Sequence, residues 1–352
     1  MAVSNWGVNH PLARKHWAAK LMTETLKMVQ VMNMASKGTN SLIYVKDETS
    51  KGKGDKITYG LRTQLTGRGV GGDDTLEGQE EALNLHTDSI LINQLRHAVN
   101  AGGKMSRQRV PFESREECKD GLADWWKNRF ETSLFNHLCS NDDETDLLYT
   151  GHNSVTAADA AHRVVASEHS TTASLSTTST FKLLDIDHAI EKGKTQAIGG
   201  NGNLRQIKVD GGNYWVCYLH PYQMTDLRTN SADGQWLDLQ KNAGARGSDN
   251  PIWSDVAGVY RDVLIKESWY VPTGPATGSG ATRRAVLCGA QALCMAFGRG
   301  DSMTQLDWVE KVFDYENILN VKAGCIFGTK KTTFNSEDVG TIQILTAANA
   351  HA

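Results

Sequence analysis

Residues 54–139 predict a long two-stranded arm followed by one long helix. The strand candidates cover residues 54–66 and 89–95. A two-stranded hairpin is only marginally stable in water unless something packs against it. The segment between the strands is polar and glycine-rich, so it cannot supply that packing. We therefore expect the hairpin to reach another subunit through its tip, which holds Gly67, Arg68, Gly69, Gly71, Gly72, Asp73 and Asp74.

The long helix is predicted over residues 114–139, a rod of roughly 40 Å at 1.5 Å per residue. Ser114 and Glu117 have the spacing of a capping box, which predicts where the helix begins. Apolar residues recur at every fourth position and form a stripe along one side. We expect this stripe to pack into the core through Leu122, Trp126, Phe130 and Leu134.

Short segments spread over most of the chain carry a family resemblance. In order they are GDKIT (54–58), LRTQLTG (61–67), LEG (76–78), EEAL (80–83), QLRHAV (94–99), GKMS (103–106), ADW (123–125), EK (310–311), FDY (313–315), AG (323–324), FG (327–328) and KKT (330–332). Their order and spacing resemble the major capsid proteins of tailed phages, in the large family typified by the N-four-like podoviruses.

That resemblance implies an α+β chain with the HK97-like capsid fold. It implies an N-terminal arm (1–43), an extended loop formed by the hairpin (44–88) and a peripheral domain (89–180) whose spine is the long helix. It further implies an axial domain (181–310) and return strands of the peripheral domain (311–352).

The function implied is that of a major capsid protein that self-assembles into the icosahedral shell around phage double-stranded DNA. The chain would then pair with itself in hexamers and pentamers of the virion capsid, assembled in the host bacterial cytoplasm. The other partners implied are a portal, separate scaffold or decoration proteins, and packaged DNA bound without sequence preference.

The charge balance fits a shell better than a dedicated nucleic-acid binder. Lys and Arg number 37 and Asp and Glu number 40, whereas a nucleic-acid-binding domain is expected to be basic. Basic residues gather in the predicted arm: Arg14, Lys15, Lys20 and Lys27. They form either a solvated face of a helix packed on its own subunit or an arm laid against a neighbour or the shell interior.

Nothing in the spacing of the cysteines indicates a metal site or a disulfide framework. The six cysteines are irregularly placed and contain no CxxC pair, so we expect buried free thiols and no cofactor. No apolar run approaches the roughly 18 residues of a membrane span, so no membrane partner is expected.

The strongest enzyme-like signal is the G-x-G-x-x-G pattern of residues 67–72, which follows a strand. It supports one alternative, a nucleotide-dependent oxidoreductase. A dinucleotide site needs a helix N-terminus directly after the glycines. The residues that follow include Asp73, Asp74 and Glu77, which would repel a phosphate. A structural protein without catalytic residues is therefore the preferred interpretation.

The rest of the chain predicts a mixed α/β unit and a final set of strands. Residues 181–192 are a helix candidate, residues 214–219 a buried strand that His220 and Pro221 end, and residues 269–272 an edge strand. Residues 285–293 are either a strand or the start of a helix. Residues 320–329 and 340–345 are expected to return to the sheet beside the long helix.

Overall fold

The structure is a computed structural model of the chain. It describes residues 31–46, 54–62, 65, 67–83, 85–109, 111, 113–166, 169, 171–195, 204–209, 212–230, 258–275, 281–298 and 306–350. The predicted basic arm residues Arg14, Lys15, Lys20 and Lys27 lie outside these ranges.

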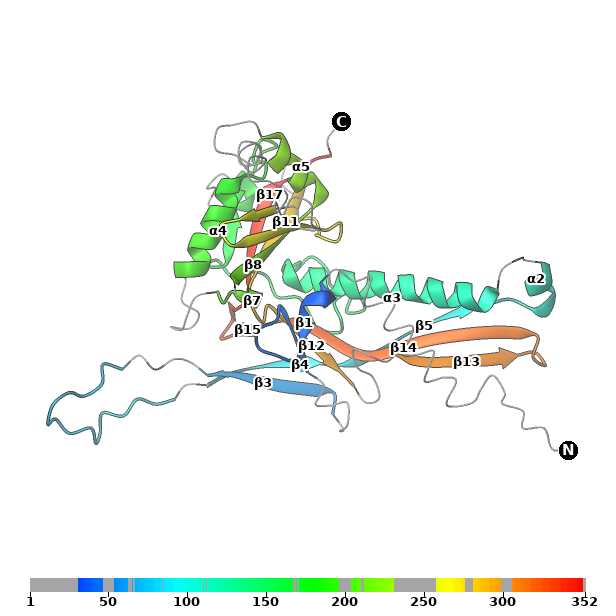
Figure 1. The fold of residues 1–352 in the computed structure, drawn as a ribbon, viewed down its shortest axis with the longest axis horizontal. Coiled ribbons are helices and arrows are strands. Elements are labelled where there is room, and N and C mark those ends of the chain that lie inside the picture. Colours follow the sequence, from blue (N-terminus) through cyan, green and yellow to red (C-terminus); the bar gives the residue numbers. More distant parts are fainter. Residues whose placement is uncertain are drawn as a thin grey trace.

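The first sheet has six strands and carries the long helix on one face (Figure 1). Its order is β1 (Ala35–Ser36), β2 (Ile43–Lys46), β12 (Leu293–Phe297), β14 (Ile318–Lys331) and β13 (Asp307–Phe313), with β5 (Asn93–Asn100) also paired to β14. The helix α3 (Ser114–Leu138) packs against β14 and β5. One continuous core cluster joins the helix to this sheet.

The long helix confirms the periodicity and begins at Ser114 as predicted, but its N-terminal cap differs from the prediction. Glu113 is the N-cap, with extended backbone and no side-chain capping bond, and Ser114 is already helical. The predicted capping box is therefore absent, because Ser114 lies one position too far into the helix. The helix is also buried on all sides over its last turns, from Ser133 to Leu138, where it enters the space between the two sheets.

The second sheet has seven strands and two helices. Its order is β6 (Arg163–Val165), β17 (Thr341–Ala347), β11 (Thr282–Cys288), β8 (Gly212–Leu219), β10 (Val263–Glu267) and β9 (Gly258–Tyr260), with β7 (Ile207–Val209) paired to β8. The helices are α4 (Leu183–Thr195) and α5 (Pro221–Thr229). Apolar residues of α4, α5 and this sheet form a core cluster of their own.

Two strands occupy a different sheet from the one predicted. β12 was expected in the axial unit but pairs with β2 and β14 of the first sheet. β17 was expected beside the long helix but pairs with β11 and β6 of the second sheet. Both strands are buried along their whole length, so alternation of polar residues gives no information about their neighbours.

Two smaller predictions also change. Residues 269 and 270 form a turn and residues 271 and 272 have no regular structure, so the predicted edge strand is absent. The predicted strand over residues 89–95 is two strands, β4 (Leu85–Leu91) and β5, which Ile92 separates.

The predicted hairpin consists of β3 (Lys56–Arg62) paired antiparallel with β4, from Lys56 opposite Leu91 to Arg62 opposite Leu85. Its base packs on β12 of the first sheet through Ile57 and Ile90, and its tip occupies one end of the long axis (Figure 1). The short elements are α2 (Lys104–Arg109), the 3-10 turns η1 (Met32–Met34) and η4 (Thr172–Ser174), and the pair β15 (Thr333–Phe334) and β16 (Glu337–Asp338).

Two of the connections between the sheets pack against each other. Residues 289–292 connect β11 to β12, and residues 332–340 connect β14 to β17. The Gly289 N–H donates to the Gly340 carbonyl over 2.8 Å. A Cβ at Gly340 would lie 2.4 Å from the Ala292 Cα, so only glycine lets these connections pack together.

Candidate functional site

The hairpin tip is exposed and contains no helix. Gly69 and Gly72 have φ values of 74° and 69°, which glycine adopts without strain. The Gly67 N–H donates to the Glu81 carboxylate over 2.6 Å, and the Gly78 N–H donates to the Glu80 carboxylate over 2.8 Å. The first bond joins the two sides of the tip, and the second is local to one side. Since no helix follows the glycines through residue 83, the tip lacks the helix N-terminus that a dinucleotide site requires.

Apolar side chains are unusually exposed along the hairpin. The exposed fraction is 57% for Leu65, 60% for Leu76, 54% for Leu83, 63% for Leu85 and 46% for Leu91. Single exposed leucines are ordinary, but a series on one projecting element is typical of an interaction surface. The glycines and charges of the tip were predicted to make the contact, whereas these leucines were not.

The four predicted packing residues of the long helix lie in the first core. Leu122, Trp126, Phe130 and Leu134 are each fully buried. The Trp126 ring centroid lies 5.2 Å from that of Phe130 and 6.1 Å from that of Phe327 on β14. The helix is therefore attached to the sheet by an aromatic cluster.

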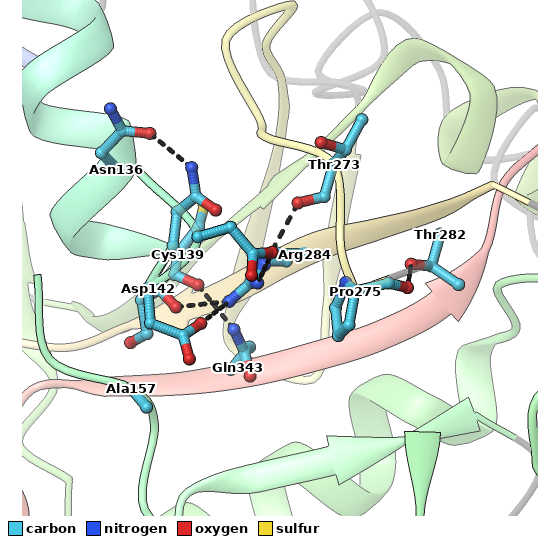
Figure 2. A network of polar contacts seen from close by, with 12 residues as sticks. Asn136, Cys139, Asp142, Ala157, Thr273, Pro275, Thr282, Arg284 and Gln343 are labelled. Carbon is cyan, nitrogen blue, oxygen red and sulfur yellow. Dashed lines mark hydrogen bonds and ion pairs between the residues drawn. The ribbon is translucent and has the colours of Figure 1, made fainter. Parts of the chain in front are cut away.

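A buried arginine lies where the end of α3 meets the second sheet (Figure 2). Arg284 on β11 donates to the Ser140 carbonyl over 2.6 Å and to the Thr273 carbonyl over 3.1 Å. It also pairs with Asp142 and Asp143, at 2.6 Å each. The arginine thus connects the loop after α3 to β11, and the Gln343 side chain adds a 2.6 Å bond to the Cys139 carbonyl.

A second buried charge lies nearby, on β14. Lys331 pairs with Asp338 of β16 over 2.6 Å, and both side chains are about fully buried, at 1% and 2% exposed. The Lys331 ammonium also donates to the Ser140 hydroxyl over 2.8 Å and to the Ala157 carbonyl over 3.3 Å. Both buried cations therefore bind the residues that follow α3, and together we call Arg284, Lys331, Asp338, Asp142 and Asp143 the polar junction.

The polar junction was not predicted from the sequence. Arg284 and Lys331 each follow another basic residue in a polar stretch, ATRRA (281–285) and TKKT (329–332), so neither one is marked as a buried charge. Asp142 and Asp143 lie far from Arg284 in the sequence, and the seven-residue spacing from Lys331 to Asp338 predicts no pairing by itself.

His137 lies beside the polar junction and is held neutral. Its Nε2–H donates to the Thr150 carbonyl over 2.7 Å, and its Nδ1 accepts from the Lys331 backbone N–H over 3.4 Å. Burial lowers the pKa of His137 to about 4, with the charges of Lys331 and Lys330 acting in the same direction against the Thr150 bond. A second proton would have to enter at Nδ1, which already faces an N–H group.

Acidification should therefore destabilise the fold between pH 6.5 and 4. An unfolded histidine takes up a proton near pH 6.5, whereas folded His137 does so only near pH 4. Over that interval the unfolded state binds more protons, and the unfolding free energy falls by about 1.4 kcal/mol per pH unit for this group. Urea denaturation at several pH values should show a shallower dependence for His137→Gln. Equal slopes for the two proteins would disprove this role of His137.

All six cysteines are buried and free, as the spacing predicted. No cluster of potential metal ligands is present in the described ranges. Among the same residues, no helix is both long and apolar enough to cross a membrane.

A protein-family model described as "Phage capsid protein" matches residues 5–350. The chain belongs to this phage capsid protein family. A "Major capsid protein" of Pseudomonas phage KPP25 is 26% identical over 378 residues, which cover 94% of each chain. The "Capsid of Ralstonia phage GP4" superposes with a TM-score of 0.80 at 30% identity over 100% of both chains. The capsid of cyanophage Pam1 superposes with a TM-score of 0.73 at 18% identity, over 99% of this chain and 100% of that chain.

These similarities establish the HK97-like capsid fold over the full chain, with its long helix. The protein is a major capsid protein, a non-enzymatic structural component of the phage head shell in the virion. The oxidoreductase alternative is therefore wrong. In the sequence, the acidic residues after the glycines would repel a phosphate. In the structure, the tip has no helix whose N-terminus could bind one.

Proposed function

We propose that the projecting hairpin is the arm by which each subunit of the shell holds a neighbour in hexamers and pentamers. The observation that supports this most is the series of exposed leucines on an element whose tip projects beyond both sheets. Burying one such side chain contributes about 1.5–3 kcal/mol. A contact made by several of them would therefore contribute several kcal/mol to assembly.

Removal of residues 67–74 tests this proposal. We expect the variant to fold and remain soluble, because the tip adds nothing to either core, and to form shells poorly. Sedimentation gives the assembled fraction, and circular dichroism gives the fold. Shells of wild-type yield and heat resistance would show that the tip has no role in assembly.

The first sheet with α3 is proposed as the peripheral domain and the second sheet with α4 and α5 as the axial domain near the capsomer centre. The division rests on the pairing of the strands into two sheets, and on the core that the second sheet forms with α4 and α5. It assigns β12 to the peripheral domain and β17 to the axial domain, which revises the boundaries expected at residues 310 and 311.

The wider partners are proposed from the resemblance and the charge distribution. They are a portal, separate scaffold or decoration proteins, and double-stranded DNA contacted weakly by Arg14, Lys15, Lys20 and Lys27 in the arm. Placement among the N-four-like podoviruses is proposed on the same resemblance. Electron micrographs of the phage that carries this chain test that placement, which requires a short tail.

The DNA contact predicts weak binding that depends on salt and not on sequence. Each phosphate contact contributes about 0.9 to the slope of log affinity against log salt. Titration of the free subunit with duplex DNA should show binding that disappears near physiological salt. Replacing the four arm residues by Gln should abolish it. Sequence-specific binding, or binding that persists in high salt, would overturn this assignment.

A further inference from the structure

A basic hollow of about 460 Å³ lies on the first sheet. Arg96 of β5, Lys322 of β14, and Lys311 and Phe313 of β13 contribute to its lining. Side chains alternate along a strand, and Glu310 faces α3, where it accepts from Arg115 over 2.6 Å. Lys311 therefore points to the opposite face of the sheet, which α3 leaves uncovered.

The register of the sheet builds this hollow. Gly324 lies opposite Arg96 on β5, and Lys322 lies opposite Val309 on β13. A Cβ at Gly324 would lie 3.2 Å from both the Arg96 Cγ and the Lys322 Cε. Glycine at this position thus lets two cationic side chains lie across the strand.

Most of the positive charge in the hollow is uncompensated. Lys322 pairs with Asp307 over 2.6 Å. Arg96 and Lys311 are exposed and have no carboxylate partner among the described residues, although the Lys311 ammonium lies 4.6 Å from the Phe313 ring centroid. The hollow therefore presents two free cations beside an aromatic ring that is 42% exposed.

The hairpin tip has the complementary character. Asp73, Asp74 and Glu77 are exposed and make no ion pair within the described part of the chain, whereas Glu80 and Glu81 are occupied by backbone N–H groups. Leu76 lies among these carboxylates and is 60% exposed. The tip thus offers free acids and an apolar side chain to a surface of free cations and an aromatic ring.

The tip cannot reach the hollow of its own chain. The hairpin tip and the turn between β13 and β14 lie at opposite ends of the long axis (Figure 1). A contact between them must join two copies in a head-to-tail manner. Such heterologous contacts generate closed rings when the rotation closes.

We propose that the acidic tip of one subunit docks into the basic hollow of the next copy, with Asp73 and Asp74 opposite Arg96 and Lys311. This inference rests on the proposed self-assembly of the chain and names the surface that receives the arm. Because these charges are exposed, they set which surfaces pair and how strongly salt weakens assembly.

Charge reversal tests the docking in the full-length chain. Arg96→Glu with Lys311→Glu, and separately Asp73→Lys with Asp74→Lys, should each lower the assembled fraction about tenfold at low salt. The four substitutions combined should restore assembly to within about twofold of wild type. Lys208→Glu with Arg228→Glu, on exposed residues of the second sheet unit, changes net charge equally and should leave assembly unchanged.

Two outcomes would overturn the docking alone. Reversed variants that assemble like wild type would show that the charges play no part. Loss in the hollow variant without restoration in the combined variant would assign the hollow to another polyanion such as DNA. A wild-type chain that forms no shells would instead contradict the proposed self-assembly.

A cross-link measures the contact independently of shell formation. Under oxidising conditions the concentrated Asp74→Cys/Lys311→Cys chain should form disulfide-linked oligomers, and Asp74→Cys/Lys208→Cys should stay monomeric on a non-reducing gel. Equal linkage in both variants, or none in either, would overturn the proposed contact.

Discussion

Trp126→Ala is expected to lower the free energy of unfolding by about 3–5 kcal/mol, the usual cost of deleting a large aromatic side chain from a core. Trp126 is fully buried, and its ring packs on Phe130 and Phe327. Its removal leaves a cavity between α3 and β14. Closing that cavity would require the whole helix or the whole strand to shift. Urea denaturation of the isolated subunit measures the change.

Two matched variants show whether burial is the cause. Trp126→Phe should cost clearly less than Trp126→Ala, because the Trp126 Nε1–H has no hydrogen-bond partner in the described structure and a phenyl ring keeps much of the contact. Trp269→Ala removes a tryptophan that is 71% exposed and should change stability by less than about 0.5 kcal/mol. A Trp126→Ala subunit that melts within a degree of wild type would contradict the packing of α3 on the first sheet.

Lys331→Met is expected to destabilise the subunit by a similar amount, about 3–5 kcal/mol at neutral pH, because it leaves Asp338 buried without its counter-ion. The Oδ2 of Asp338 already has no hydrogen-bond partner among the described residues. Burial raises the pKa of Asp338, against the effect of Lys331. The loss should therefore shrink at lower pH, where the carboxylate protonates more readily.

The double variant Lys331→Met with Asp338→Leu separates pairing from packing. Replacing both charges by apolar groups avoids leaving either one unpaired, so the double variant should be more stable than Lys331→Met alone. Strictly additive losses would mean that Lys331 and Asp338 contribute independently and that the polar junction does not act as a unit.

The long helix was predictable because its period is local. Trp126 and Phe130 lie four residues apart, and in a strand the polar Asp124 and Asn128 would share their face, so the pattern favours a helix. The sheet to which each strand belongs could not be predicted in this way, because it depends on residues far away in the sequence. β12 and β17 are both short buried apolar strands, and only their partners, tens to hundreds of residues away, decide which sheet each one joins.

Of the two candidate contact surfaces, the hairpin tip could be predicted from the sequence and the basic hollow could not. The tip is one continuous segment whose glycines and acids are visible in the sequence. The basic hollow is assembled from Arg96, Lys311 and Lys322, which become neighbours only through the register of three strands. Sequence reading therefore found the arm and missed the surface proposed to receive it.

Electron microscopy of the purified full-length chain, with sedimentation of the same sample, tests the central claim most directly. The account predicts closed shells built from hexamers and pentamers, with the hairpin of each subunit lying on a neighbouring copy. A well-folded chain that stays monomeric at every concentration, or shells in which the hairpin contacts only its own subunit, would contradict it.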